Sequence, residues 1–123
     1  MDTGTVAIAI PADPELARAV LARGRRIASR FGLGWIAVRI LTSPREREAL
    51  RELVDALGGS LVCAEARDIA AAIIEVSRRE QSRLLVIGAS RRPRFLRRLK
   101  RGVTERILQA RRPFDVIVAG APV

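Results

Sequence analysis

The sequence predicts one α/β domain: a five-stranded parallel sheet in the strand order 3-2-1-4-5 with helices on both faces. Three observations predict it. The 123 residues suffice for one buried core. Apolar runs alternate with amphipathic stretches throughout, and runs buried on both faces are typical of parallel strands. Crossover helices between such strands produce a doubly wound, three-layer sandwich.

Five short apolar runs are the expected strands, because each is rich in β-branched or aliphatic residues. They span residues 6–10, 35–41, 61–64, 84–87 and 116–119. Cys63 lies in the third run, where we expect a small buried side chain rather than a reactive thiol. A single cysteine forms no internal disulfide, and the first residues do not resemble a secretory signal, so we expect a cytoplasmic setting.

Four helices are expected between the strands, because apolar residues recur there at helical spacing. The four stripes are Leu16, Val20, Ile27 and Phe31; Leu50, Leu53, Val54 and Leu57; Ile69, Ile73, Ile74 and Ser77; and Val103, Ile107 and Leu108. Asp13 and Asp68 are expected N-caps, and Ser43 with Glu46 is an expected capping box. Gly32 is an expected helix stop.

A ligand crevice is expected where the winding of the sheet reverses, at the carboxyl ends of the first and fourth strands. The helix that follows the fourth strand begins there too, and a small-residue turn before a helix N-terminus can hold a phosphate. The candidate ligand-binding residues are Pro11, Ala12, Asp13, Gly88, Ala89, Ser90, Gly102, Val103 and Thr104. For Asp13, helix capping already accounts for the residue, and capping is compatible with ligand contact.

The net charge of +10 is concentrated in one part of the chain. Residues 91–112 hold ten of the 23 Lys and Arg residues and a single acid. The candidate partner-binding face, called the basic segment below, consists of Arg91, Arg92, Arg94, Arg97, Arg98, Lys100 and Arg101. Its expected partner is anionic. Two interpretations stay open: an anion site, or a solvated face from which only Phe95, Leu96 and Leu99 turn inward.

Several function classes are disfavoured by the residues that the sequence lacks. It contains no His and no Tyr, the usual sources of a general base or a metal ligand, and no paired carboxylates stand out. We therefore expect no catalytic residues and no metal site. Neither a P-loop nor a dinucleotide-binding glycine pattern is present. One Trp and three Phe provide few stacking residues, which makes nucleic acid an unlikely partner.

Three stretches carry a resemblance to a known family that covers nearly the whole chain. They are residues 25–38, residues 68–80 and, most specifically, Leu85-Val-Ile-Gly-Ala-Ser-Arg-Arg92 leading through the basic segment to Gly102. In them the chain resembles the universal stress protein family, and within it the corresponding domain of KdpD-type potassium sensor histidine kinases. The resemblance implies the family's adenine nucleotide alpha hydrolase-like fold. It also implies a regulatory, non-catalytic role as one domain, residues 1–123, excised from a larger osmosensing two-component protein.

The chain departs from the pattern of ATP-binding members, which is G-x2-G-x9-G-[ST] after the fourth strand. Gly88 matches the first position, but Arg91 replaces the second glycine. Gly102 lies one residue beyond the family spacing and is followed by Val103. A bulky Arg91 would crowd the backbone approach to phosphate. The resemblance therefore implies no certain cofactor, and ATP binding in the usual manner is doubtful.

The leading hypothesis is a cytoplasmic sensory domain that binds an anionic ligand or a protein partner, either another sensor domain or a universal stress protein. The alternative is a free-standing universal stress protein that binds a nucleotide as a homodimer through its fifth strand. A third hypothesis is that the basic segment binds a membrane surface or a nucleic acid. An enzyme is the least favoured class.

Overall fold

The computed structural model describes residues 4–40, 42–89 and 102–120. In these residues the strands are β1 (Thr5–Ala9), β2 (Gly34–Ile40), β3 (Ser60–Ala64), β4 (Ser82–Gly88) and β5 (Asp115–Ala119), and the helices are α1 (Pro14–Phe31), α2 (Pro44–Ala56), α3 (Ile69–Arg79) and α5 (Val103–Gln109). Every predicted strand and helix is present. The strand ends differ from the predicted ends by at most two residues.

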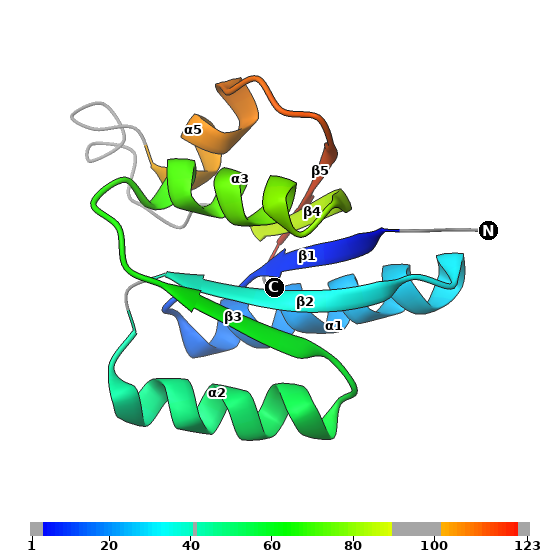
Figure 1. Ribbon diagram of the computed structural model, residues 1–123, viewed down its shortest axis with the longest axis vertical. Coiled ribbons are helices and arrows are strands. Elements are labelled where there is room, and N and C mark those ends of the chain that lie inside the picture. The colour runs from blue at the N-terminus through cyan, green and yellow to red at the C-terminus, as the bar shows by residue number, and fades with distance from the viewer. Residues whose placement is uncertain (1–3, 41, 90–101, 121–123) are drawn as a thin grey trace.

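All strand pairs are parallel, and the sheet has the predicted order β3-β2-β1-β4-β5. Figure 1 shows α1 and α2 on one face of the sheet and α3 with α5 on the other, so the fold is the expected three-layer sandwich. The central strand β1 pairs with β2 and β4, the two strands that flank it. Its carboxyl end therefore lies where the winding direction reverses.

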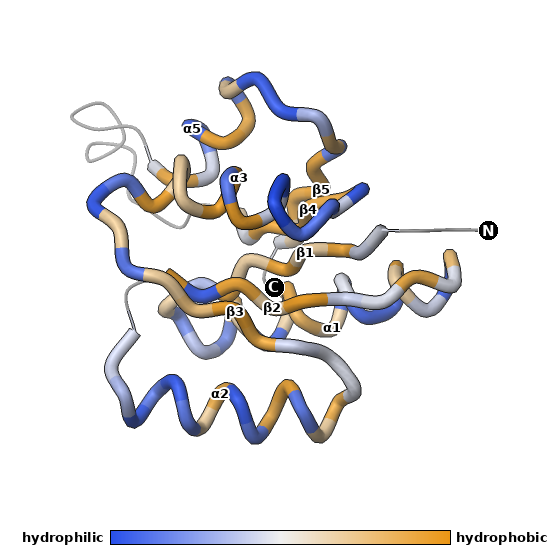
Figure 2. Tube along the Cα trace, in the orientation of Figure 1, coloured by the Kyte–Doolittle hydropathy of each residue, from blue (hydrophilic) through white to orange (hydrophobic). Residues whose placement is uncertain are grey.

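The core consists of two apolar clusters, one on each face of the sheet. Both depend on the alternation of side chains along the strands: Ile36 and Val38 face α3 and α5, whereas Val6 and Ile8 face α1. Figure 2 shows the hydrophobic colour following the central strands. Burial is lower at the sheet edges than we expected, because β3 and β5 each have only one neighbouring strand. Cys63 in β3 is accordingly half-buried rather than buried.

Three predicted stripe residues do not face the core. The exposed fractions of Phe31, Leu53 and Leu108 are 59%, 45% and 43%. Phe31 and Leu108 are at or next to the last residue of their helices, and Leu53 belongs to α2, which covers the edge side of the sheet (Figure 1). Ser77, in contrast, is fully buried, and its hydroxyl donates to the carbonyl oxygen of Ile73 at 2.7 Å.

The predicted helix caps form, with one difference. The Gly32 C-cap is left-handed, with a φ of 67°, which favours glycine. At the start of α2 the Ser43 hydroxyl accepts from the Glu46 amide at 3.2 Å, which is half of a capping box. The Glu46 carboxylate does not return the bond to Ser43. It accepts from the Thr42 hydroxyl at 3.1 Å instead.

Candidate functional site

A cavity of about 520 Å³ lies at the carboxyl ends of the central strands. The residues that line it come from β1, β2 and β4, from the loops that follow them and from α1, α3 and α5: Ala9, Ile10, Pro11, Ala12, Asp13, Leu16, Val38, Arg39, Ile40, Ile69, Ile73, Ile87, Gly88, Ala89, Gly102, Val103, Thr104 and Ile107. Eight of the nine candidate ligand-binding residues are among them. The remaining one, Ser90, lies outside the described residues, as does the entire basic segment.

Most of the cavity wall is aliphatic. Ile40 ends β2, Ile87 belongs to β4, and Ile69 and Ile73 belong to α3. Among the described lining residues, Asp13 and Arg39 carry the charges. A concave apolar site with a few polar groups is the usual character of a small-molecule pocket. The geometry thus brings the predicted residues to one cavity, and ligand binding there stays a prediction.

Asp13 has the capping role that its position predicted. Its carboxylate oxygen Oδ1 accepts a hydrogen bond from the Glu15 amide at 3.0 Å at the start of α1. The proline at the first helical position suits this start, since that position needs no N–H donor. Capping holds the carboxylate at the cavity wall, next to the end of β1.

Gly88, which matches the family glycine, has a packing reason of its own. A Cβ at this position would lie 2.8 Å from Cδ2 of Leu16, so the glycine lets the start of α1 pack closely on the end of β4. The carbonyl oxygen of Gly88 accepts a hydrogen bond from the Thr104 hydroxyl at 2.7 Å. The hydroxyl proton of Thr104 therefore joins α5 to β4 and is not available to donate to a ligand.

The start of α5 provides few polar side-chain groups to the cavity. Gly102 is the N-cap residue and provides no side-chain hydrogen bond, and the helix has only seven residues. Val103 lines the cavity with an aliphatic side chain, at the position next to Gly102 where the pattern given above has Ser or Thr. Gly102 and Val103 therefore add no polar side-chain atom to the cavity wall here, and anion binding at this turn stays a prediction.

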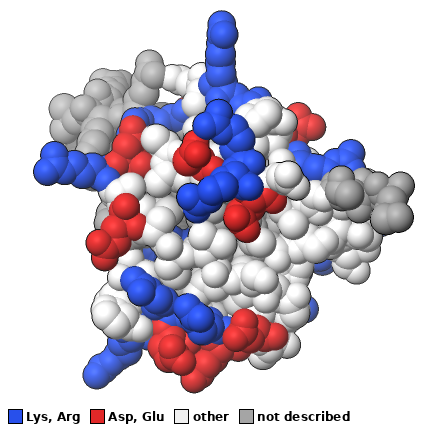
Figure 3. All heavy atoms as spheres, in the orientation of Figure 1, with Lys and Arg blue, Asp and Glu red and all other residues white. Residues whose placement is uncertain are grey.

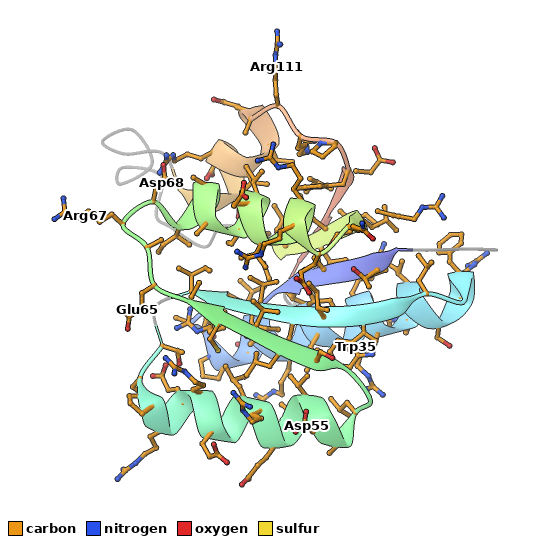
Figure 4. The ribbon with its side chains drawn as sticks, in the orientation of Figure 1. Trp35, Asp55, Glu65, Arg67, Asp68 and Arg111 are labelled. Carbon is orange, nitrogen blue, oxygen red and sulfur yellow. The ribbon has the colours of Figure 1, made fainter. Side chains whose placement is uncertain are left out.

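An ion pair joins the two helices that form one side of the cavity. The guanidinium of Arg106 in α5 donates to Oδ2 of Asp68 at 2.5 Å, while Oδ1 of Asp68 accepts from the Ala71 amide at 3.1 Å and caps α3. Figure 4 shows Asp68 at the start of α3, on the side of the sheet that α5 shares. The amide of Ala71 and then Arg106 lower the pKa of the Asp68 carboxyl below its usual 3.8.

Sequence reasoning missed Arg39. It is the sixth residue of the β2 run and lines the cavity, with a side chain that is only 17% exposed. A charged residue inside an apolar strand near the carboxyl edge was the available signal, because strand ends form the ligand crevice of such sheets. That signal does not say whether the guanidinium lies at the cavity or in solvent, which depends on α2.

Two further properties concern the described residues alone. No group of three or more His, Cys, Asp or Glu side chains lies together there in a way that would hold a metal ion. None of the helices described has the length and apolar character needed to cross a bilayer.

The comparisons with known proteins give one similarity in sequence and several in fold. No family model matches the chain. The sensor protein KdpD of Mycobacterium tuberculosis, in strains CDC 1551 / Oshkosh and ATCC 25618 / H37Rv, is 27% identical over 124 residues that cover 95% of this chain. This chain spans about 14% of the length of those proteins.

Two solved structures with bound nucleotides are similar over almost their whole length. A universal stress protein in complex with cAMP has a TM-score of 0.76 and 18% identity, covering 97% of this chain and 98% of that one. A universal stress protein from Archaeoglobus fulgidus in complex with dAMP has a TM-score of 0.67 and 16% identity, covering 97% and 99%. The chain therefore has the fold of universal stress proteins, and its sequence is similar to one part of KdpD.

Proposed function

We propose that residues 1–123 are a regulatory domain of a KdpD-type potassium sensor histidine kinase, and that the domain binds a small anionic molecule in the cavity. The observation that carries this proposal is the apolar cavity at the carboxyl ends of β1, β2 and β4, with Asp13 and Arg39 at its wall. The similarity to KdpD over 95% of the chain supports the sensor setting. In that setting the domain is part of the cytoplasmic portion of an inner-membrane protein.

A binding role, rather than catalysis, is supported by what the polar groups of the cavity already do. The Thr104 hydroxyl donates to Gly88, and the Asp13 carboxylate caps α1. A nucleophile or general base needs to be free to exchange a proton with a substrate. We therefore propose that ligand binding is read out by other domains of the sensor or by a protein partner.

The ligand test is calorimetry of the purified domain with cAMP, dAMP and magnesium ATP, since the first two are bound by solved relatives. We expect a monophosphate to bind, and ATP to bind at least tenfold more weakly, because Arg91 and Val103 replace the small residue and the hydroxyl of the phosphate loop. A micromolar, magnesium-dependent ATP complex would contradict the second expectation. If none of the three binds, the ligand is not one of these nucleotides, and the proposed small-molecule function then fails unless the carboxylate probe described below binds.

A free-standing homodimer is the second candidate, and β5 is the observation that favours it. This strand is at the edge of the sheet, and its Val118 is 42% exposed. An edge strand with exposed apolar side chains can pair with a second copy. We expect Val118→Arg to convert such a dimer to a monomer in light scattering at micromolar concentration, whereas a wild-type monomer would remove this candidate.

A further inference from the structure

Arg39 is a cation at the wall of an apolar cavity. Its side chain is 17% exposed, and it is the only Lys or Arg among the described residues that line the cavity. A guanidinium in such a place keeps only part of its hydration, so an anion that accepts hydrogen bonds from its N–H groups is favoured there. The hydrogen bonds that Arg39 already makes therefore show which of its N–H groups are left for a ligand.

Within the described residues, only some of the hydrogen-bond donors of the Arg39 guanidinium have an acceptor. Nη1 donates to the carbonyl oxygen of Ile40 at 3.1 Å. Nη2 lies 3.9 Å from Oε2 of Glu46, which is beyond hydrogen-bond distance. That oxygen already accepts from the Thr42 hydroxyl, and the Glu46 side chain is 59% exposed. Since a guanidinium has five N–H donors in a planar fork, most of them have no acceptor among the described residues.

The other described polar groups of the cavity do not offer a comparable place for an anion. The Thr104 hydroxyl proton is bonded to Gly88, and Asp13 would repel a second negative charge. Val38 and Ile40, the neighbours of Arg39 in β2, belong to the apolar cluster on the α3 side of the sheet, whereas the Arg39 side chain lies on the α2 side, near Glu46. An anionic group is thus favoured at the β2 end of the cavity, and an apolar ring or chain is favoured beyond it.

We propose that Arg39 is the anion anchor of the cavity: its guanidinium binds the phosphate or carboxylate of a small ligand, and the apolar body of that ligand crosses the carboxyl edge of β2 to pack against the isoleucines of β2 and α3. Paired N–H groups of arginine match both anions in a bidentate geometry. Glu46 acts as a positioning residue, since its carboxylate keeps the guanidinium near α2 until an anion takes its place. This inference rests on the proposed function and adds the class of ligand and the residue that selects it.

The experiment measures the preference for charged over neutral ligands. Two probe pairs share an apolar body: dAMP with deoxyadenosine, and naphthalene-2-carboxylate with naphthalene-2-carboxamide. For at least one pair we expect the wild type to bind the anion tenfold or more tightly than the neutral partner. The pair that shows this preference identifies phosphate or carboxylate as the group bound. Arg39→Gln should abolish the preference and leave affinity for the neutral partner within about twofold.

Two variants separate anion binding from a structural role. Glu46→Gln removes the competing carboxylate, so anion affinity should stay equal or rise, whereas a purely structural Arg39–Glu46 pair predicts a loss for both members of a probe pair. Arg39→Lys keeps the charge and should keep part of the preference. Arg18→Gln, on the exposed side of α1, is the matched control and should change nothing.

Three outcomes would overturn the inference. An unchanged preference in Arg39→Gln means that the anion binds elsewhere. An equal loss of affinity for the charged and the neutral probe means that Arg39 supports the fold only. If Arg39→Gln does not fold, the comparison of Glu46→Gln and Arg39→Lys decides between anion binding and a purely structural role. If the wild type binds no probe at all, the proposed function fails together with the inference.

Discussion

Two glycines determine how closely α1 approaches the sheet. A Cβ on Gly24 would lie 2.4 Å from Cδ1 of Ile8, and a Cβ on Gly88 would lie 2.8 Å from Cδ2 of Leu16. Ile8 is fully buried, and Leu16 is a wall residue of the cavity. Neither glycine has the positive φ that would explain it by backbone conformation. Close packing of α1 against β1 and β4 is their physical reason.

Gly24→Ala tests this packing. Alanine favours a helix interior by about 1 kcal/mol over glycine, but overpacking a core costs about 1–3 kcal/mol. Because Ile8 cannot move into solvent, we expect a net loss of up to ~2 kcal/mol in the free energy of unfolding, measured by urea denaturation. Gly34→Ala is the control, since a Cβ there meets nothing within 4 Å and the residue is exposed. Stabilisation of the Gly24 variant would contradict the argument.

At the scale of elements, α5 depends on its neighbours. A helix of seven residues is too short to be stable alone in water. Three contacts with other elements hold it: Ile107 is fully buried, the Thr104 hydroxyl bonds to Gly88, and Arg106 pairs with Asp68. Since α5 forms part of the cavity wall, these contacts also determine the shape of the candidate site.

Asp68→Asn tests the ion pair between α3 and α5. The folded-state pKa of Asp68 is lowered, first by the Ala71 amide and then by Arg106, so its contribution to stability is present above about pH 3.8 and is lost as the pH falls through the lowered pKa. Asparagine retains the cap but not the charge. We expect a small loss of stability at pH 7 and a flatter pH profile below pH 4, measured by thermal unfolding.

Glu75→Gln is the control for that variant. Glu75 pairs with Arg78 at 2.7 Å within the exposed surface of α3, and pairs of this kind contribute little. Its removal should shift the melting temperature less than Asp68→Asn does. Equal shifts, or an unchanged acid profile in Asp68→Asn, would show that the interhelix pair has no special role.

For the whole molecule, charge is distributed unevenly between the described surface and the basic segment. Acids and basic residues both occur over the face seen in Figure 3, and they lie side by side over α2 at its lower edge. The basic segment, within residues 91–101, holds seven cations and no acid, which is +7 of the total +10. A concentration of like charge repels itself and attracts anionic partners over a Debye length of about 8 Å at physiological salt.

The partner role of the basic segment is tested by reversing three of its charges. We expect Arg94, Arg97 and Arg98 changed together to Glu to lose association with an acidic protein or an anionic lipid vesicle, with near-normal thermal stability. Wild-type binding should weaken steeply as salt rises. The control reverses Arg18, Arg23 and Arg26 on the exposed face of α1, an equal change in net charge. Equal effects of the two triple variants would mean that net charge alone, rather than this segment, drives association.

The elements could be predicted from the sequence because their signals are local. Strand and helix periods, the Asp13 and Asp68 caps and the Gly32 stop each depend on neighbouring residues, and the structure confirms them. The strand order and the position of the crevice could also be predicted, because crossover connections between parallel strands are almost always right-handed, which leaves few possible topologies. Sequence reasoning thus brought eight of the nine candidate residues to the cavity that the structure describes.

Only the tertiary structure decided which side chains face the cavity and what they bond. The Thr104–Gly88 bond joins residues 16 positions apart, and the Arg106–Asp68 pair joins residues 38 apart, so neither has a local signal. The periodicity of α1 could not show that Phe31 is exposed, since burial at a helix end depends on the neighbour that covers it. The surroundings of Arg39 were likewise decided by the tertiary structure. A strand pattern gives the position of the residue, but the partners of its guanidinium depend on where α2 packs.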